Sequence, residues 1–195
     1  NCAALPEQLF EAEVFGVMAG AFTGAQKDRP GKLELAHNGT LYLDEIDSLP
    51  LSCQAKLLNA LQYRAAIRLG GHVFYNSVFR VIASTKTKLE TLVEQNRFRE
   101  DLHFRLSVSQ VRIPALAERL EDIIPLYCHF LNDVAAQFKL EVPKLDLEDT
   151  DELLSRPWPG NVRELQNALR RSVVIGEGDE IETLVRATAD QAHRV

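Results

Sequence analysis

The sequence predicts an α/β protein: a parallel β-sheet with flanking helices, followed by a small all-helical subdomain. Two apolar runs, Thr40–Leu43 and Phe79–Ser84, have the composition of strands that are buried on both faces. Each run ends in polar residues, at the position where open parallel sheets bind their ligands. From Leu116 onward the patterns are helical and no further strand is predicted, which indicates a second, helical subdomain.

Composition excludes several broad classes. The 195 residues are 46% hydrophobic and 26% charged, as in an ordinary globular protein. A formal net charge of −6 argues against a general binder of nucleic acids or membrane surfaces. The three cysteines, Cys2, Cys53 and Cys128, lack metal-ligand spacing, and no signal peptide or bilayer-spanning run is visible. We therefore expect a cytoplasmic protein with reduced thiols, and the first residue, Asn1, suggests a fragment of a longer chain.

Two adjacent acids, Asp44 and Glu45, follow the first predicted strand directly. At the end of a buried parallel strand, one carboxylate can hold Mg²⁺ through its oxygens while its neighbour polarises a water molecule. Phosphoryl transfer requires this division of roles. The alternative is a strand that simply ends in surface acids, and these six residues alone do not decide between the two interpretations.

The remaining elements of this first part are predicted from hydrophobic periodicity, caps and turn residues. A Pro-initiated helix should run from Leu5 to a stop at Gly16. A short helix, an amphipathic helix and a hairpin turning at two glycines should follow, at Gly31–His37, Ser52–Tyr63 and Ile67–Phe74.

The hexapeptide Gly20-Ala21-Phe22-Thr23-Gly24-Ala25 has neither a helical nor a strand period, so we expect a loop. A loop aromatic either folds back onto the core or presents an apolar tip to a partner. As a string, GAFTGA resembles the sigma-54-binding loop in the central AAA+ ATPase domain of bacterial enhancer-binding proteins, the activators of sigma-54 RNA polymerase. That resemblance implies that this loop contacts sigma-54, with Phe22 and Thr23 as the contact residues.

The same resemblance assigns roles around the acid pair. Asp44 and Glu45 match the Walker B acids, which implies that Asp44 organises Mg²⁺ and Glu45 activates the attacking water. Asn1 matches an asparagine that pairs with the Walker B glutamate, and Thr85 matches the sensor I threonine of the nucleotide site. The next position is usually Asn, but here it is Lys86, as in a subset that resembles regulators of C4-dicarboxylate transport.

Downstream, Phe98, Leu102 and Leu106 recur every four residues, which predicts a helix with one buried stripe. Arg99 and Arg105 lie off that stripe and should point outward. Exposed arginines usually serve only solubility. In this motif, however, they match paired arginine fingers that reach the nucleotide of a neighbouring subunit, where an arginine offsets charge developing on the γ-phosphate.

A further strand is predicted at Ser107–Ile113, from alternation around its valines, with Pro114 ending it. The predicted domains are therefore 1–114 for the α/β subdomain, 115–178 for the helical lid and 179–195 for a tail. Within the lid we expect helices at Asp122–Phe138, Asp149–Ser155 and Asn161–Gly176, with a polar linker at 139–149.

The string WPGNVREL, with Asn161 as an expected helix cap, is the second specific match. Arg163 corresponds to the sensor II arginine, which reaches the phosphates of its own subunit's nucleotide. As a surface residue alone, a cation in the first turn of a helix is electrostatically unfavourable, and this favours an anionic partner.

A P-loop, GxxxxGK[ST], is absent from the sequence. By the resemblance it should lie upstream of Asn1, so the fold expected here is a P-loop AAA+ three-layer αβα sheet truncated at its N-terminal side. Without a backbone cradle for the phosphates, residues 1–195 alone should bind ATP weakly or not at all and hydrolyse none.

We therefore interpret the chain as part of the ATP- and Mg²⁺-dependent core of a sigma-54-dependent activator. It should act as a ring, a hexamer as in the family, that remodels the closed promoter complex of sigma-54 RNA polymerase, with DNA bound by a helix-turn-helix outside this chain. Two alternatives are another AAA+ remodeller, which GAFTGA opposes, and a catalytically inactive module that only binds sigma-54 or oligomerises. Glu45→Gln separates the last from an ATPase, because only an ATPase would then trap nucleotide.

Overall fold

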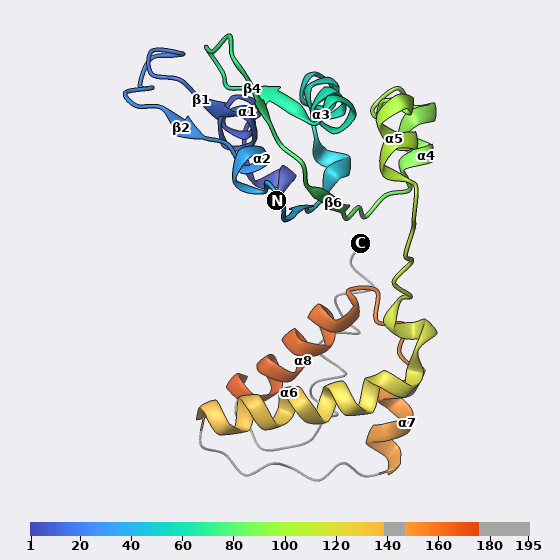
Figure 1. The fold of residues 1–195 in the computed structure, drawn as a ribbon. Helices are drawn as coiled ribbons and strands as arrows, with labels where there is room; N and C mark the ends of the chain where they lie inside the picture. Colours follow the sequence, from blue (N-terminus) through green and yellow to red (C-terminus); the bar gives the residue numbers. More distant parts are fainter. Residues whose placement is uncertain (139–146, 176–195) are drawn as a thin grey trace. The chain divides into compact units, whose positions relative to one another are not determined.

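The computed structural model describes residues 1–138 and 147–175 of the chain (Figure 1). The chain divides into two compact units, Asn1–Gln110 and Val111–Val195. No helix among the described residues is long and apolar enough to cross a membrane. Each unit has a hydrophobic core of its own.

The first unit alternates short helices and short strands. Its strands form three two-stranded sheets, an antiparallel β1–β2 pair, a parallel β3–β6 pair and an antiparallel β4–β5 pair. The strands are β1 (Gly16–Val17), β2 (Arg29–Pro30), β3 (Thr40–Leu43), β4 (Ala65–Ile67), β5 (Phe74–Asn76) and β6 (Arg80–Ala83). The helices are η1 (Cys2–Ala4), α1 (Glu7–Phe15), α2 (Lys32–Leu35), η2 (Ile46–Ser48), α3 (Leu51–Tyr63), α4 (Leu89–Glu94) and α5 (Glu100–Leu106). The predicted helices and the predicted hairpin are confirmed, whereas α4 was not predicted.

The parallel pair β3–β6 confirms that the two apolar runs are strands, but burial on both faces was wrong. Leu41 and Leu43 point into the core, where they join residues of α1 and α3. On the opposite face Tyr42 is 57% exposed and Ile82 42% exposed. An apolar run predicts a strand but does not show how many faces of the sheet are covered by other elements. In this unit the described elements cover only one face of the β3–β6 pair.

Two glycines allow the loop after α1 to begin where it does. Gly16 ends the helix at φ 84°, a left-handed conformation that suits glycine. Gly31 follows Pro30, the strand partner of Gly16, and a Cβ on Gly31 would come within 2.3 Å of the Val14 carbonyl oxygen. The close approach pairs β1 with β2, so the segment between these strands projects as a closed loop (Figure 1).

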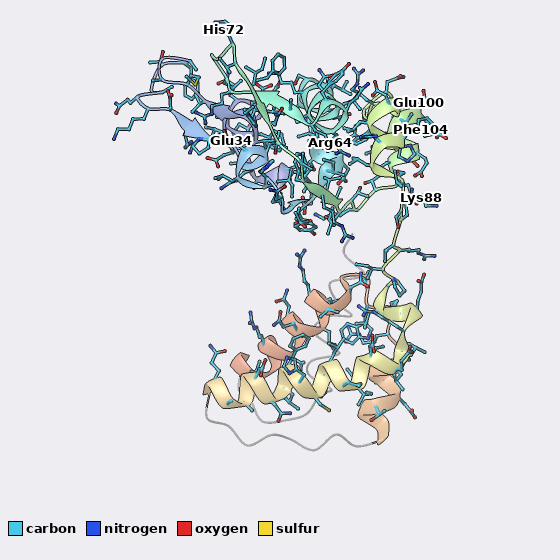
Figure 2. The ribbon with its side chains drawn as sticks, in the orientation of Figure 1. Glu34, Arg64, His72, Lys88, Glu100 and Phe104 are labelled. Atoms are coloured by element: carbon cyan, nitrogen blue, oxygen red, sulfur yellow. The ribbon has the colours of Figure 1, made fainter. Side chains whose placement is uncertain are left out.

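The β4–β5 hairpin lies beside that loop. The Met18 amide donates to the Leu69 carbonyl at 2.9 Å, and the Leu69 amide donates to the Gly16 carbonyl at 2.9 Å. Figure 2 shows His72 at the tip of the hairpin, pointing away from the body of the unit. The two projections, far apart in sequence, therefore share a hydrogen-bonded base.

The second unit is helical in its described part, as predicted. It contains η3 (Leu116–Glu118), η4 (Leu120–Asp122), α6 (Ile123–Phe138), α7 (Leu147–Ser155) and α8 (Asn161–Ile175). Trp158 is 2% exposed at the centre of its core, and its indole Nε1 donates to the Leu153 carbonyl at 2.9 Å. The predicted linker at 139–149 lies outside the described residues up to residue 146, and the predicted tail at 179–195 lies outside them entirely.

Two local predictions were wrong. Residues 107–113 form no strand, and Val108, Val111 and Ile113 are between 79% and 88% exposed. Alternation alone cannot make a strand, because a strand needs a partner, and no described segment pairs with this one. The second error concerns Asn161, whose side-chain oxygen accepts from the Leu116 amide at 2.7 Å instead of capping α8. Glu164 reaches back to the Gly160 amide at 2.7 Å and satisfies the start of that helix.

Candidate functional site

The carboxyl ends of β3 and β6 meet at one edge of the parallel pair. Leu43 lies opposite Ala83, so the residues that follow each strand are neighbours. The Ser84 amide donates to the Leu43 carbonyl at 2.9 Å, and the Ile46 amide donates to the Ser84 carbonyl at 3.0 Å. This backbone pairing brings Asp44 and Glu45 next to the segment Ser84–Lys86, as expected for a ligand-binding edge.

Asp44 is the carboxylate with the most donors at this edge. Its Oδ1 accepts from the Ser84 hydroxyl at 2.5 Å and the Tyr42 hydroxyl at 3.3 Å, and its Oδ2 accepts from Asn1 Nδ2 at 3.2 Å. The Ser84 hydrogen bond, with smaller contributions from Tyr42 and Asn1, lowers the pKa of Asp44 below its usual value. The group is therefore an ionised oxygen ligand of the kind that Mg²⁺ prefers.

Asn1 pairs with Asp44, and not with Glu45 as predicted. Its Nδ2 donates to Asp44, while its Oδ1 accepts from the Ala3 amide at 2.8 Å and caps η1. The Cys2 amide also donates to the Asp44 carbonyl at 2.8 Å. Both ends of the Asn1 amide are thus engaged, Nδ2 by the first acid of the pair and Oδ1 by the first turn of η1.

Glu45 has a different partner. Its backbone is left-handed, at φ 55° and ψ 50°, and its amide donates to the Ser84 hydroxyl at 3.3 Å. Its side-chain Oε1 lies 2.5 Å from the Lys86 ammonium. The sequence marked Lys86 as unusual at its position but did not reveal this ion pair, because the two residues meet only through the β3–β6 register.

Thr85, the predicted sensor I residue, lies at the same edge. Its hydroxyl donates to the Thr87 carbonyl at 2.7 Å and accepts from the Thr87 amide at 3.2 Å. This is a local turn in which the side chain engages its own backbone. Its predicted contact with nucleotide stays a prediction.

Arg99 is exposed, as predicted, and is tied to a neighbour. Its guanidinium forms a bidentate ion pair with the Asp101 carboxylate, in which Nε donates to Oδ1 at 3.0 Å and Nη2 donates to Oδ2 at 2.7 Å. This pair raises the pKa of Arg99 and lowers the pKa of Asp101. Figure 2 shows Glu100 and Phe104 projecting outward from the same helix, and Phe104 is 68% exposed.

Arg105, the second predicted finger, is also exposed and also held within the unit. Its Nη2 donates to the Leu61 carbonyl at 3.1 Å, near the C-terminal end of α3. A cation is favourable at that end of a helix because the last carbonyls lack partners. Both arginines therefore have intramolecular partners that they would have to leave to reach a neighbouring subunit.

Arg99 is positioned by a buried glutamine, Gln54, which the sequence analysis did not identify. Gln54 on α3 is fully buried, and its Nε2 donates to the Leu49 carbonyl at 2.7 Å and the Arg97 carbonyl at 3.1 Å. Its Oε1 accepts from the Arg99 amide at 2.8 Å. The sequence did contain a signal for this role, because Gln54 is a polar residue at a core position of the amphipathic helix. Buried amides are nearly always hydrogen-bonded, so such a residue indicates a buried hydrogen-bond network.

The hexapeptide 20–25 forms the tip of the loop between β1 and β2. The Gly20 amide donates to the Ala25 carbonyl at 2.8 Å, and the Ala25 amide donates to the Phe22 carbonyl at 3.0 Å. These bonds close the tip and leave Phe22 48% exposed, while Thr23 is exposed as well. An aromatic ring on a closed, projecting loop suits contact with a protein partner.

Arg163, the predicted sensor II residue, lies in the second unit. It is exposed in the first turn of α8, the end of the helix where an anion is favoured. Glu164, the next residue, already provides one negative charge there. The predicted nucleotide contact of Arg163 stays a prediction.

Comparison with known proteins identifies the family to which this chain belongs. The "Sigma-54 interaction domain" family matches residues 1–112, and the "AAA+ ATPase lid domain" family matches residues 117–191. A probable regulatory protein of a pathogenicity locus, HrpR of Pseudomonas syringae pv. syringae, is 51% identical over 86% of this chain and 54% of its own length. The C4-dicarboxylate transport regulator DctD of Pseudomonas aeruginosa is 46% identical over 100% of this chain and 42% of its own length. Since regulators of different systems match about equally well, the dicarboxylate subset stays a prediction.

Comparison with solved structures supports the same family. NtrX from Brucella abortus matches with a TM-score of 0.82 and 36% identity, over 92% of this chain and 40% of that chain. Its complexes with ADP and with ATP each match with a TM-score of 0.79. The chain spans about half the length of the curated relatives, or less. The predicted fold and the predicted family are confirmed: the first unit belongs to the sigma-54 interaction domain family of transcriptional activators, and the helical unit that follows is its AAA+ lid.

Proposed function

We propose that this chain is part of an ATPase that uses hydrolysis to remodel sigma-54 RNA polymerase at a closed promoter. The observation that carries the proposal is that an ionised Asp44 lies next to Glu45 at the edge where the carboxyl ends of β3 and β6 meet. NtrX, a structural relative of this chain, has been solved in complex with ADP and with ATP, and this supports a nucleotide as the ligand. We expect the protein to act in the cytoplasm.

The residues at this edge fit the metal- and water-binding half of such a site. Asp44 has carboxylate oxygens in an ionised state and would hold Mg²⁺, which neutralises phosphate charge when bound. Glu45 would orient the attacking water and accept its proton. The described residues offer no phosphate cradle.

The arginines supply the second half of the proposal. Arg99 and Arg105 would leave Asp101 and the Leu61 carbonyl to stabilise charge on nucleotide bound by a neighbouring subunit, within a ring that we expect to be a hexamer. Thr85 and Arg163 would contact the nucleotide of their own subunit. The exposed Phe22 and the rest of the hexapeptide would bind sigma-54, and DNA would be bound by a helix-turn-helix domain.

The test is the ATPase rate of the full-length protein as a function of its concentration. Catalysis across a subunit interface predicts a specific rate that rises with concentration and is lost in Arg99→Ala. Asp101→Asn is the matched control, because it removes the carboxylate charge that pairs with Arg99 and leaves the arginine in place. A rate that is independent of concentration and unaffected by Arg99→Ala would contradict the role in trans.

One observation favours a second candidate, a module that binds sigma-54 without turnover. The carboxylate of Glu45 is engaged by Lys86, so the group expected to activate water is not free in this conformation. Glu45→Gln decides between the candidates. An ATPase variant should retain nucleotide and block activation, whereas the inactive module should behave like the parent protein.

A further inference from the structure

One carboxylate joins the two ends of the projecting segment between β1 and β2 (Figure 1). Asp28, the residue before β2, accepts a hydrogen bond from the Ala19 amide at its Oδ1, at a distance of 2.8 Å. Ala19 lies two residues after the end of β1, so this bond closes the segment that carries the hexapeptide at its tip. Because the acceptor is a carboxylate, the bond is stronger than one to a neutral oxygen.

The Ala19 amide differs from the amides around it in its acceptor. Its neighbours in sequence all donate to backbone carbonyls: Met18 to Leu69 at 2.9 Å, Gly20 to Ala25 at 2.8 Å and Ala21 to Met18 at 3.1 Å. Of these four consecutive amides, all within the described part of the chain, only that of Ala19 depends on a side chain. A substitution of Asp28 can therefore remove one support of the loop and leave the backbone hydrogen bonds in place.

The cation nearest in charge to Asp28 already has another partner. Arg68, which follows β4 at the base of the hairpin, donates to both carboxylate oxygens of Glu34, from Nε at 3.0 Å and from Nη2 at 2.7 Å. The hydrogen bond with Glu34 is the main cause of the raised pKa of Arg68, and the charge of Asp28 makes a smaller contribution. Since Glu34 occupies the guanidinium, the carboxylate of Asp28 is available to the Ala19 amide.

The loop tip is held by hydrogen bonds and not by packing. Phe22 does not belong to the hydrophobic core of the first unit and is 48% exposed. Gly20 and Gly24 flank it at φ 81° and φ 104°, and a Cβ on either would meet no atom within 4 Å. Glycines in open space allow many backbone conformations. The hydrogen bonds of the loop therefore determine where the ring points.

We propose that Asp28 is a positioning residue for partner binding, whose carboxylate keeps the loop closed with Phe22 presented at its tip. This inference rests on the proposed contact between the hexapeptide and sigma-54. A loop that already has its bound conformation loses less conformational entropy on binding, so Asp28 strengthens the association without touching the partner. When the contact is absent, only a fraction of the molecules has a loop that is ready to bind, and the apparent affinity falls by that fraction.

The experiment measures the affinity of the full-length protein for labelled sigma-54 by fluorescence anisotropy, with a non-hydrolysable ATP analogue present throughout. Asp28→Ala removes the acceptor, whereas Asp28→Asn keeps an oxygen at the same position and removes the charge. We expect Asp28→Ala to weaken binding roughly threefold to tenfold, the range for one lost hydrogen bond, and Asp28→Asn to weaken it by less than about twofold. An ion pair between Asp28 and sigma-54 would instead make both variants lose affinity to a similar extent.

Hydrogen–deuterium exchange of the unbound protein gives a readout that does not involve the partner. The Ala19 amide should exchange faster in Asp28→Ala and close to the parent rate in Asp28→Asn. Lys27→Ala is the matched control, because Lys27 is the preceding residue, is exposed, and has no side-chain hydrogen bond or ion pair with another described residue. It should change neither the exchange of the Ala19 amide nor the affinity for sigma-54.

The outcomes separate this inference from the proposed function. If Phe22→Ala abolishes sigma-54 binding while Asp28→Ala binds like the parent protein, the positioning role is refuted and the proposed contact stands. If Phe22→Ala leaves binding intact, the proposed contact fails and the inference fails with it. Weaker binding in Asp28→Ala without faster exchange at Ala19 also refutes positioning, because the carboxylate would then act on the partner directly. Weaker binding together with faster exchange, both restored in Asp28→Asn, supports the inference.

Discussion

Gln54 offers the sharpest test of how the first unit positions its arginine. Gln54→Met keeps the length of the side chain and removes its three hydrogen bonds, to the Leu49 carbonyl, the Arg97 carbonyl and the Arg99 amide. Because Gln54 is fully buried, water cannot easily replace these bonds. A buried group left without a partner costs about 1–3 kcal/mol, but two of these three hydrogen bonds are only part-buried, so we expect a local loss of roughly 2–4 kcal/mol for the three together.

Hydrogen–deuterium exchange of the full-length protein measures this loss where it occurs. Since about 1.4 kcal/mol corresponds to a tenfold change, amides of residues 97–106 should exchange roughly 30- to 700-fold faster in Gln54→Met. Gln62→Met is the matched control, because Gln62 lies on the same helix and is exposed. It should alter exchange little, as most surface substitutions do.

The same variant links this hydrogen-bond network to function. If Gln54 sets the backbone from which Arg99 projects, Gln54→Met should lower the ATPase rate toward that of Arg99→Ala without changing nucleotide affinity. Equal exchange in Gln54→Met and Gln62→Met would refute the reasoning, since it would show that the buried amide does not hold the start of α5. A normal ATPase rate despite faster exchange would separate stability from positioning.

Three further outcomes are expected. Ser84→Ala removes the hydrogen bond that contributes most to the lowered pKa of Asp44, so the pKa of Asp44 should rise. Asp44 would then become protonated at a higher pH than in the parent protein, and the acid limb of the ATPase pH profile should shift to higher pH. Phe22→Ala should abolish sigma-54 binding while the ATPase rate persists and stability changes by less than about 0.5 kcal/mol, because the ring is 48% exposed. Gly70→Ala places a Cβ 2.6 Å from the Ala21 Cβ at φ 74°, and the strain of roughly 1–3 kcal/mol should lower the melting temperature and weaken sigma-54 binding.

Periodicity and local strings predicted most of the elements of this chain. The helix that ends at Gly16 and the hairpin that turns at Gly70 and Gly71 depend on residues close together in sequence, and both formed as expected. The family followed from GAFTGA and WPGNVREL for the same reason. The strand expected at 107–113 failed because pairing is a tertiary property that alternation does not contain.

Partners at the site were harder to predict than the residues themselves. Asp44 and Glu45 are adjacent and chemically alike, so the sequence alone could not determine which of them Asn1 would contact. The structure resolves this through the backbone: Glu45 takes a left-handed conformation, its amide bonds to Ser84 after β6, and its carboxylate pairs with Lys86. Asp44 then remains beside η1 for Asn1.

That left-handed turn has a consequence for mechanism. A non-glycine residue at φ 55° is energetically unfavourable unless its surroundings hold it, and here the holding contacts come from the end of β6. The Ser84 hydroxyl receives the Glu45 amide and donates to Asp44, so one side chain couples the backbone of one acid to the charge of the other. To activate water, the carboxylate of Glu45 would have to leave Lys86, while the Ser84 contact still fixes the backbone of Glu45. Only the end of its side chain is released, which is the part that must meet water.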